Sequence, residues 1–312
     1  MNKRKSLEEI VRLWKEDKEK FVKASTFSVY VILIENHILP YFKNFQTINE
    51  DDVQKFVLEK INQGLSIKTI KDIVIVLKMI IKFAQKLGLF CYRQINIKFP
   101  QQKTKAELKV LSKTDHKKIM KYVYENFTFK NFGICLCLST GMRIGEVCGL
   151  LWKDFDLQNQ VIKVRRTIQR IYVIDGNKRY TKIICDYPKT KNSIRDIPIS
   201  SNLLKIIKPL KKLVNDDYYV LTNSPVPTEP RAYRNYYKKF LNTLGIENFK
   251  FHGLRHSFAT RCIESKCDYK TVSVLLGHSN INTTLNLYVH PNLEQKKKCI
   301  DQMFKQLMWS VK

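Results

Sequence analysis

The chain has 312 residues and lacks any run of about eighteen apolar residues, the length that a membrane-spanning helix needs. Its longest apolar stretch, residues 73–83, is interrupted by Lys78 and Lys82. The basic N-terminus leads directly into charged sequence, without the hydrophobic core of a signal peptide. These absences exclude a membrane protein and a membrane partner, and they make a bacterial cytoplasmic location the default expectation.

Paired cysteines of the CxxC type are also missing, although the chain contains eight cysteines. Cys135 and Cys137 stand two positions apart, a spacing that suits neither a zinc knuckle nor a thioredoxin-like motif. We therefore expect reduced and mostly buried thiols. No nucleotide-binding loop and no acidic cluster of metal ligands is visible in the sequence, so no cofactor is expected.

Acidic residues are scarce beside basic ones: 28 Asp and Glu stand against 56 Lys and Arg, a formal net charge of +28. Such a charge repels itself unless the protein lies against a polyanion. A lysine-rich proteome offers another explanation, but it usually supplies matching glutamate. The charge predicts a nucleic-acid partner whose binding weakens steeply with salt. Low glycine together with abundant Lys, Ile and Asn suggests an AT-rich bacterial genome or a mobile element.

The N-terminal part, residues 1–98, has the pattern of a helical domain. Residues 99–108, with one proline, polar residues and no periodicity, have the pattern of a linker. Capping boxes, in which Ser or Thr precedes Glu by three positions, predict where two of the helices begin. These pairs are Ser6 with Glu9 and Thr47 with Glu50.

A further helix is expected over residues 66–87, with Gly88 as its C-terminal stop. Its apolar residues supply a face for the domain core. Four lysines fall close to another face, and no acidic residue after Asp72 balances them. We predict that these lysines contact DNA phosphates: Lys71, Lys78, Lys82 and Lys86.

The pattern changes beyond the linker, where helical sequence over 112–152 is followed by strand-like sequence and then by more helices. A hairpin turn is expected at Asp175-Gly176. The predicted fold class is mainly α with a small antiparallel β-sheet. The strand candidates are residues 161–166, 168–174, 179–186 and 194–199.

Cleavage of DNA without a metal needs a nucleophile, cations that bind phosphate oxygens, and groups that donate and accept protons. Four segments carry such residues. The segment 140–146, TGMRIGE, places Arg143 at a helix start, where backbone N–H groups favour an anion. A hairpin tip expected at 188–193, PKTKNS, presents Lys189 and Lys191.

The third segment, HGLRH at 252–256, places His252 and Arg255 on one face of a helix. The fourth is LGH at 276–278, followed ten residues after the histidine by Tyr288. Each segment alone has an ordinary explanation, such as a surface arginine, a capping histidine or one tyrosine among fifteen. The occurrence of all four segments in one chain, in this order, favours an active site.

In order and spacing these segments resemble the tyrosine recombinases, or phage integrase family, which includes Xer-like recombinases and transposon integrases. The resemblance is strong over residues 110–290 and only general in the N-terminal helices. The matching residues are Gly141, Arg143 and Glu146 for the G-x-R-x-x-E box, His252 and Arg255 for the H-x-x-R box, Leu276, Gly277 and His278 for the LGH box, and Tyr288 for the tyrosine.

The resemblance implies an enzyme in which Tyr288 attacks the scissile phosphorus, leaving a 3′-phosphotyrosine and a free 5′-hydroxyl. That intermediate conserves the energy of the phosphodiester bond, so rejoining needs neither ATP nor a metal. The resemblance also implies roles for the other residues. Arg143, Arg255 and His278 bind the non-bridging oxygens, and His252 accepts the tyrosine proton or holds it in a hydrogen bond. Lys189 protonates the leaving oxygen, with Lys191 as the alternative, Glu146 orients Arg143 or a neighbour, and His256 supports the site.

The resemblance also implies a SAM-like core-binding domain in residues 1–98, a catalytic domain in 109–290, and a C-terminal tail in 291–312 that docks onto a neighbouring protomer. The expected assembly is a homotetramer on double-stranded DNA sites, a dimer on each site, with an accessory directionality factor as a further candidate partner. The chain begins almost directly in the core-binding domain, so no separate arm-binding module is expected before it.

The favoured function is integration or transposition of a mobile element by site-specific recombination. Two alternatives stay open: an Xer-like housekeeping resolvase, and a DNA-binding protein that has kept this fold without cleaving. A type IB topoisomerase shares much of the chemistry, but the H-x-x-R histidine and the LGH box favour a recombinase.

Overall fold

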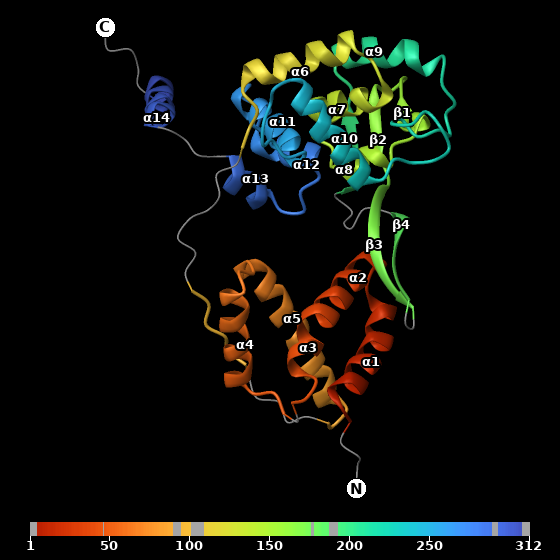
Figure 1. The fold of residues 1–312 in the computed structure, drawn as a ribbon. Helices are drawn as coiled ribbons and strands as arrows, with labels where there is room; N and C mark the ends of the chain where they lie inside the picture. The colour runs from red at the N-terminus through yellow and green to blue at the C-terminus, as the bar shows by residue number, and fades with distance from the viewer. Residues whose placement is uncertain are drawn as a thin grey trace. The chain divides into compact units, whose positions relative to one another are not determined.

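The chain forms two compact units in the computed structural model, each built mainly of helices (Figure 1). The first unit holds residues 1–106 and 170–184, and the second holds residues 107–169 and 185–312. Small antiparallel sheets complete them, so the predicted fold class is confirmed. The structure describes residues 5–45, 47–89, 95–100, 109–175, 178–186, 193–288 and 293–307.

The helices of the first unit surround one apolar core. The long helix α5 supplies eight buried residues to it, and Phe42 and Phe56 pack against each other at a ring-centroid distance of 5.1 Å. A π-helical stretch, η2, connects α2 to α3. The elements are α1 (Leu7–Lys18), η1 (Glu19–Phe21), α2 (Ala24–Leu33), η2 (Ile34–Ile38), α3 (Leu39–Phe42), α4 (Glu50–Asn62) and α5 (Ile67–Lys86).

The helix ends of this unit follow the sequence pattern with one exception. The capping box of Ser6 and Glu9 is confirmed at the start of α1. The prediction of a box at Thr47 and Glu50 is wrong, because α4 begins two residues later and its box is formed by Asn49 and Asp52. Asn caps a helix as well as Thr does, and in both pairs the capping residue precedes an acidic residue by three positions. Either pair could therefore have formed the capping box.

Gly88 ends the first unit's long helix as predicted. It follows α5 with a φ of +70°, in the left-handed region that favours glycine. The N–H of Gly88 donates to the carbonyl of Gln85, and the N–H of Leu89 donates to the carbonyl of Ala84. The carbonyls at the helix end therefore keep hydrogen-bond partners.

A β-hairpin from the middle of the chain contributes to the first unit. It consists of β3 (Thr167–Asp175) and β4 (Lys178–Asp186), which form a two-stranded sheet. The backbone N–H of Tyr172 donates to the Ser28 hydroxyl on α2 at 2.7 Å, and Arg179 lies 3.7 Å from Glu35. The two strands were expected from the sequence, whereas their packing against α2 was not.

The second unit wraps helices around a three-stranded antiparallel sheet in the order β1-β2-β5 (Figure 1). In the register of β2 and β5, Ile162 is opposite Ile197 and Val164 is opposite Arg195. The elements are α6 (Lys113–Glu125), α7 (Phe129–Thr140), α8 (Ile144–Cys148), η3 (Trp152–Asp154), β1 (Phe155–Asp156), β2 (Val161–Val164), β5 (Arg195–Pro198), α9 (Ser201–Lys211), α10 (Pro230–Thr243), α11 (His252–Glu264), α12 (Tyr269–Leu276), α13 (Ile281–Tyr288) and α14 (Leu293–Leu307).

Helix α7 lies in the middle of the second unit's core. A Cβ added at Gly133 would lie 2.2 Å from Leu221 and 2.5 Å from the Tyr233 hydroxyl, so a larger residue would force these side chains to shift. The rings of Phe132 and Trp152 stack at 6.1 Å. Because nine of its twelve residues are buried, α7 is a rigid base for the turn that follows it.

The described cysteines are all free thiols, but only three of the six are buried. Cys135, Cys137 and Cys148 lie in the core around α7, where burial raises their pKa values. Cys185 and Cys267 are exposed, so the expectation of mostly buried cysteines is wrong for this part of the chain. Within the described residues, no helix combines the length and apolar character needed to cross a bilayer.

Candidate active site

The turn between α7 and α8 places the first arginine. Gly141 ends α7 with a φ of +66°, and a Cβ there would lie 2.5 Å from Phe258 and 2.8 Å from Leu276. Glycine therefore allows both the turn and the close approach of α11 and α12. Arg143 follows as the N-cap of α8, at the helix start that the sequence predicted.

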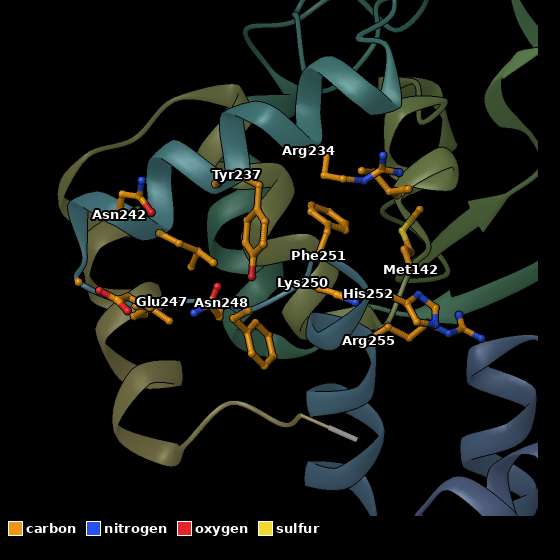
Figure 2. Close-up of a pocket in the computed structure, with 16 residues that line it drawn as sticks. Met142, Arg234, Tyr237, Asn242, Glu247, Asn248, Lys250, Phe251, His252 and Arg255 are labelled. Carbon is orange, nitrogen blue, oxygen red and sulfur yellow. The ribbon is translucent and has the colours of Figure 1, made fainter. Parts of the chain in front are cut away.

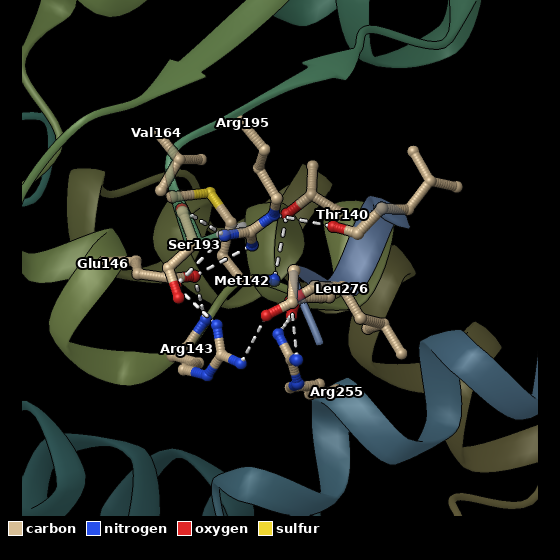
Figure 3. Close-up of polar contacts among 12 residues, drawn as sticks. Thr140, Met142, Arg143, Glu146, Val164, Ser193, Arg195, Arg255 and Leu276 are labelled. Atoms are coloured by element: carbon tan, nitrogen blue, oxygen red, sulfur yellow. Dashed lines mark hydrogen bonds and ion pairs between the residues drawn. The ribbon is translucent and has the colours of Figure 1, made fainter. Parts of the chain in front are cut away.

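Glu146 is a buried carboxylate, 3% exposed, that binds two arginines (Figure 3). It accepts hydrogen bonds from the side chain and the backbone N–H of Arg143, both at 2.8 Å. It also accepts from both terminal nitrogens of Arg195, at 3.1 and 2.9 Å. Burial alone would raise the pKa of Glu146, but the hydrogen bonds and charges of Arg195 and Arg143 lower it, so Glu146 is ionised.

Arg255 is almost fully buried, with 2% exposure, on α11. Its two terminal nitrogens donate to the carbonyl of Gly141 at 2.9 Å and to that of Leu276 at 2.7 Å. These bonds tie the H-x-x-R helix to the turn that carries Arg143 and to the end of α12. Arg255 thus reaches the site from the interior of the unit.

The C-terminal end of α12 is the point where three arginines meet. Successive carbonyls of Leu275, Leu276 and Gly277 accept hydrogen bonds from Arg195, Arg255 and Arg143, respectively. Helix ends leave such carbonyls without intrahelical partners and carry partial negative charge, so cations stabilise them. Figure 3 shows Arg143, Arg195 and Arg255 directed toward this end of the helix.

Two histidines lie side by side at the start of α11. The rings of His252 and His256 meet edge to face at a centroid distance of 4.6 Å. Burial and the charges of Arg255 and Arg143 lower the pKa of His252, and burial, with His252 and Arg255 nearby, lowers that of His256 to about 4. Both rings are therefore neutral at pH 7, and His252 can accept a proton.

His278 is positioned by a residue that the sequence reading missed. Its Nδ1 lies 2.8 Å from the hydroxyl of Thr284, which is completely buried on α13. Burial, then the charges of Arg255 and Arg143, lower the pKa of His278 to about 4. In the tautomer in which Nδ1 accepts from Thr284, the neutral ring carries its proton on Nε2 and can donate it to a phosphate oxygen.

Replacing Thr284 with valine should therefore slow DNA cleavage by about 10- to 100-fold, the range found when partners that orient a histidine are removed. Thr284→Ser keeps the hydroxyl and should stay close to the wild-type rate. The exposed neighbour Thr283→Val is the matched control. The measurement is the single-turnover rate on a nicked DNA substrate; equal rates for Thr284→Val and Thr284→Ser would contradict this role.

A cavity of about 900 Å³ opens beside His252 and Arg255 (Figure 2). Tyr237, Phe251 and Met142 supply apolar and aromatic walls, while basic side chains of α10 and the following loop add positive charge. The cavity places His252 and Arg255 at the edge of an opening that a ligand can enter. The basic residues that line it are Arg234, Lys238 and Lys250.

The structure thus brings together four of the predicted catalytic residues: Arg143, His252, Arg255 and His278. Tyr288 is the last residue of α13, the helix that holds Thr284, and its side chain lies outside the described part of the structure. Lys189 and Lys191 also lie outside the described residues.

The four lysines proposed to contact DNA lie on α5, but two of them already make contacts within the first unit. The ammonium group of Lys78 donates to the carbonyl of Ile95 at 2.5 Å, and Lys71 lies 5.1 Å from the centre of the Phe99 ring. Lys82 and Lys86 are exposed. The latter pair is better placed to contact phosphates than the half-buried Lys78.

Arg195 is the second residue that the sequence reading missed, although a signal was present. The expected strand at 194–199 alternates so that Arg195 shares a face with Ile197 and Ile199, and all three are buried. An arginine in a core-facing position needs a buried acidic or carbonyl partner. The sequence does not show which residue that partner is.

Comparison with known proteins agrees with this geometry. The model of the phage integrase family matches residues 109–295, and that of the phage integrase N-terminal SAM-like domain matches residues 6–61. The tyrosine recombinase XerC-like protein of Caldanaerobacter subterraneus subsp. tengcongensis is 32% identical and aligns with 90% of this chain and 78% of its own length. The ICEBs1 integrase of Bacillus subtilis is 26% identical, with coverages of 87% and 75%.

Solved structures show the same fold. The Tn1549 transposon integrase in complex with a circular intermediate DNA has a TM-score of 0.76 at 19% identity and covers 96% of this chain and 99% of its own. A λ integrase tetramer bound to a Holliday junction has a TM-score of 0.64 at 16% identity, with coverages of 92% and 78%.

The chain belongs to the phage integrase family. It is a tyrosine site-specific recombinase, an enzyme that transfers DNA strands. The resemblance read from the four sequence segments is confirmed.

Proposed function

We propose that this recombinase cleaves and rejoins DNA at the arginine–histidine cluster described above, with Tyr288 as the nucleophile. The observation that carries the proposal is the meeting of Arg143, Arg255 and Arg195 at the end of α12, next to a neutral, oriented His278. Of these three, Arg143 and Arg255 are the preorganised cations that stabilise charge developing on phosphate oxygens during phosphoryl transfer.

In the proposed reaction Tyr288 attacks the scissile phosphorus and the 5′-oxygen leaves. Arg143, with 36% of its side chain exposed, and Arg255 bind the non-bridging oxygens, and His278 donates to them from Nε2. His252 accepts the tyrosine proton, and Lys189, with Lys191 as the alternative, protonates the leaving oxygen. The reverse sequence joins the 3′-phosphate to a new 5′-hydroxyl without ATP or a metal.

A nicked suicide substrate tests this proposal. When cleavage releases a short strand, religation fails and the covalent protein–DNA adduct accumulates. We expect a single adduct whose tryptic peptide contains Tyr288 linked to a 3′-phosphate. An adduct on another tyrosine would refute the assignment of Tyr288. So would the absence of any adduct on a DNA site that the protein otherwise cleaves.

The proposed enzyme has one domain that binds DNA and one that carries out catalysis. Residues 1–98 form the core-binding domain, 99–108 the linker, 109–290 the catalytic domain and 291–312 the exchange tail. Double-stranded DNA is the substrate, with Lys82 and Lys86 as phosphate contacts in the first domain. The site of action is DNA in the bacterial cytoplasm, since the named relatives include bacterial recombinases.

A mobile element is the proposed source of the DNA substrate. The relatives include the integrase of ICEBs1 and the transposase from transposon Tn916, which is 26% identical over 59% of this chain, but Xer recombinases are also among them. An Xer-like resolvase is therefore the second candidate. Excision of the flanking element by the purified chain would support the first, and resolution of a chromosomal dimer site the second.

The C-terminal tail is proposed to link protomers in a tetramer. Helix α14 exposes three apolar side chains, Ile300, Met303 and Phe304, which are 54%, 46% and 50% exposed. An apolar face of this kind is suited to dock on a neighbouring subunit.

Removing residues 295–312 should leave binding to a single site intact, because the proposed DNA contacts lie elsewhere. It should reduce synapsis and cleavage by at least about 10-fold if the docked tail completes the neighbour's site. Gel-shift titration measures binding, and native electrophoresis of two-site complexes measures synapsis. Recombination at the full rate by the truncated chain would eliminate exchange of the tail.

A further inference from the structure

Arg195 is a buried arginine with no part in the reaction as proposed above. We infer that it is a positioning residue, which holds Glu146 and the end of α12 so that Arg143 and His278 can act on the phosphate. This inference rests on the proposed catalytic roles of Arg143 and His278. It adds to them a cation that does not touch DNA.

The contacts of Arg195 join three segments that are far apart in the sequence (Figure 3). Its Nε donates to the carbonyl of Leu275 at 2.7 Å, and its terminal nitrogens donate to the two oxygens of Glu146 at 3.1 and 2.9 Å. One terminal nitrogen also donates to the carbonyl of Ser193 at 3.2 Å. All three nitrogens of this side chain, which is 4% exposed, donate to internal acceptors, so it is bound inside the protein rather than by a phosphate.

The charge of Arg195 determines how strongly the Glu146 carboxylate binds its other partner, Arg143. A buried carboxylate needs a full compensating charge, and removal of one partner is costly. With Arg195 in place, that charge comes from the interior, and Arg143 can remain 36% exposed and available to a phosphate. Without Arg195, the carboxylate would hold Arg143 as its only cation and compete with the DNA.

The geometry of Arg195 fixes the segment that leads to His278. Leu275 is three residues before His278, and its carbonyl is bound by an arginine that is anchored in the β2–β5 ladder opposite Val164. A side chain held by a strand of the sheet positions its partners more accurately than one on a loop. The strand β5 therefore orients the turn that carries His278 through this single guanidinium.

The test compares rate constants for adduct formation with Arg195→Gln. We expect the single-turnover rate constant to fall about 10- to 100-fold, as for loss of a partner that orients the groups of a site. Arg166→Gln is the matched control, because Arg166 is also a partly buried arginine paired with an acid, Asp154, in the same unit. It should lower the unfolding temperature and the fraction of active protein, but leave the rate constant of the active fraction unchanged.

A second variant separates charge from simple stability. In Glu146→Gln/Arg195→Gln no uncompensated carboxylate competes for Arg143, so the rate constant should recover about 10-fold over Arg195→Gln. Arg195→Lys keeps the charge but loses the fork that serves several acceptors, and its rate constant should be about 10-fold below that of the wild type.

The wild-type chain and Tyr288→Phe are measured in the same assay, so that failure of the proposed catalysis can be distinguished from failure of the positioning role of Arg195. If the wild-type chain forms no adduct, the proposed catalysis fails. If the wild-type chain does form the adduct, three results would each refute only the positioning role of Arg195. These are a wild-type rate constant in Arg195→Lys, a wild-type rate constant in soluble Arg195→Gln, and a double variant that is no faster than Arg195→Gln.

Discussion

Tyr288→Phe should abolish the covalent adduct with a suicide substrate while leaving DNA binding in place. The substitution removes only the hydroxyl oxygen that is proposed to attack phosphorus, and phenylalanine supplies no nucleophile. We expect the adduct to fall below detection, a loss of more than about 10⁴-fold if the oxygen forms the new bond. Denaturing electrophoresis of labelled DNA measures the adduct, and gel shift measures binding.

Tyr269→Phe is the matched control for that experiment, since Tyr269 is an exposed tyrosine at the start of α12. It should form the adduct at the wild-type rate. Persistence of the adduct in Tyr288→Phe would move the nucleophile to another residue, and loss of the adduct in both variants would point to a general defect.

Arg255→Gln should reduce the rate of adduct formation by at least about 10³-fold, the lower range for an arginine that stabilises a phosphoryl-transfer transition state. The variant should also be less stable by about 1–3 kcal/mol for each buried carbonyl left without a donor. Those carbonyls belong to Gly141 and Leu276. Cleavage and thermal unfolding should thus both be affected.

Arg261→Gln on the same helix is the control for Arg255. Arg261 is also partly buried, pairs with Glu264 and donates to the carbonyl of Leu111, but it contacts none of the proposed catalytic residues in the described structure. It should lower the unfolding temperature without changing the rate constant of folded protein. Cleavage by Arg255→Gln within 10-fold of the Arg261→Gln rate would show that Arg255 serves the fold alone.

The residues proposed for catalysis could be found in the sequence because each belongs to a local pattern with its own physical meaning. Gly141 and Arg143 mark a tight turn into a helix, and His252 and Arg255 stand one helical turn apart. Spacing alone could not identify Arg195 or Thr284, because their partners, Glu146 and His278, meet them only in the folded chain. For Arg195 the strand alternation indicated burial but not the partner.

The helices and strands were predictable to a similar extent, with errors where two signals competed or where a tertiary contact decided. Thr47 and Asn49 offered the same capping geometry, and the chain uses Asn49. The lysine stripe of α5 was predicted to contact DNA phosphates, yet Lys78 binds the carbonyl of Ile95. Such contacts depend on the path of a segment that has no periodicity of its own.

The membership of the β3–β4 hairpin in the first unit has a consequence for dissecting the protein. A fragment that starts after residue 106 would carry Tyr172 and Arg179 without Ser28 and Glu35, their partners on α2 and η2. A single cut therefore cannot yield two self-sufficient halves, and a soluble C-terminal fragment calls for excision of residues 170–184 and a short replacement turn.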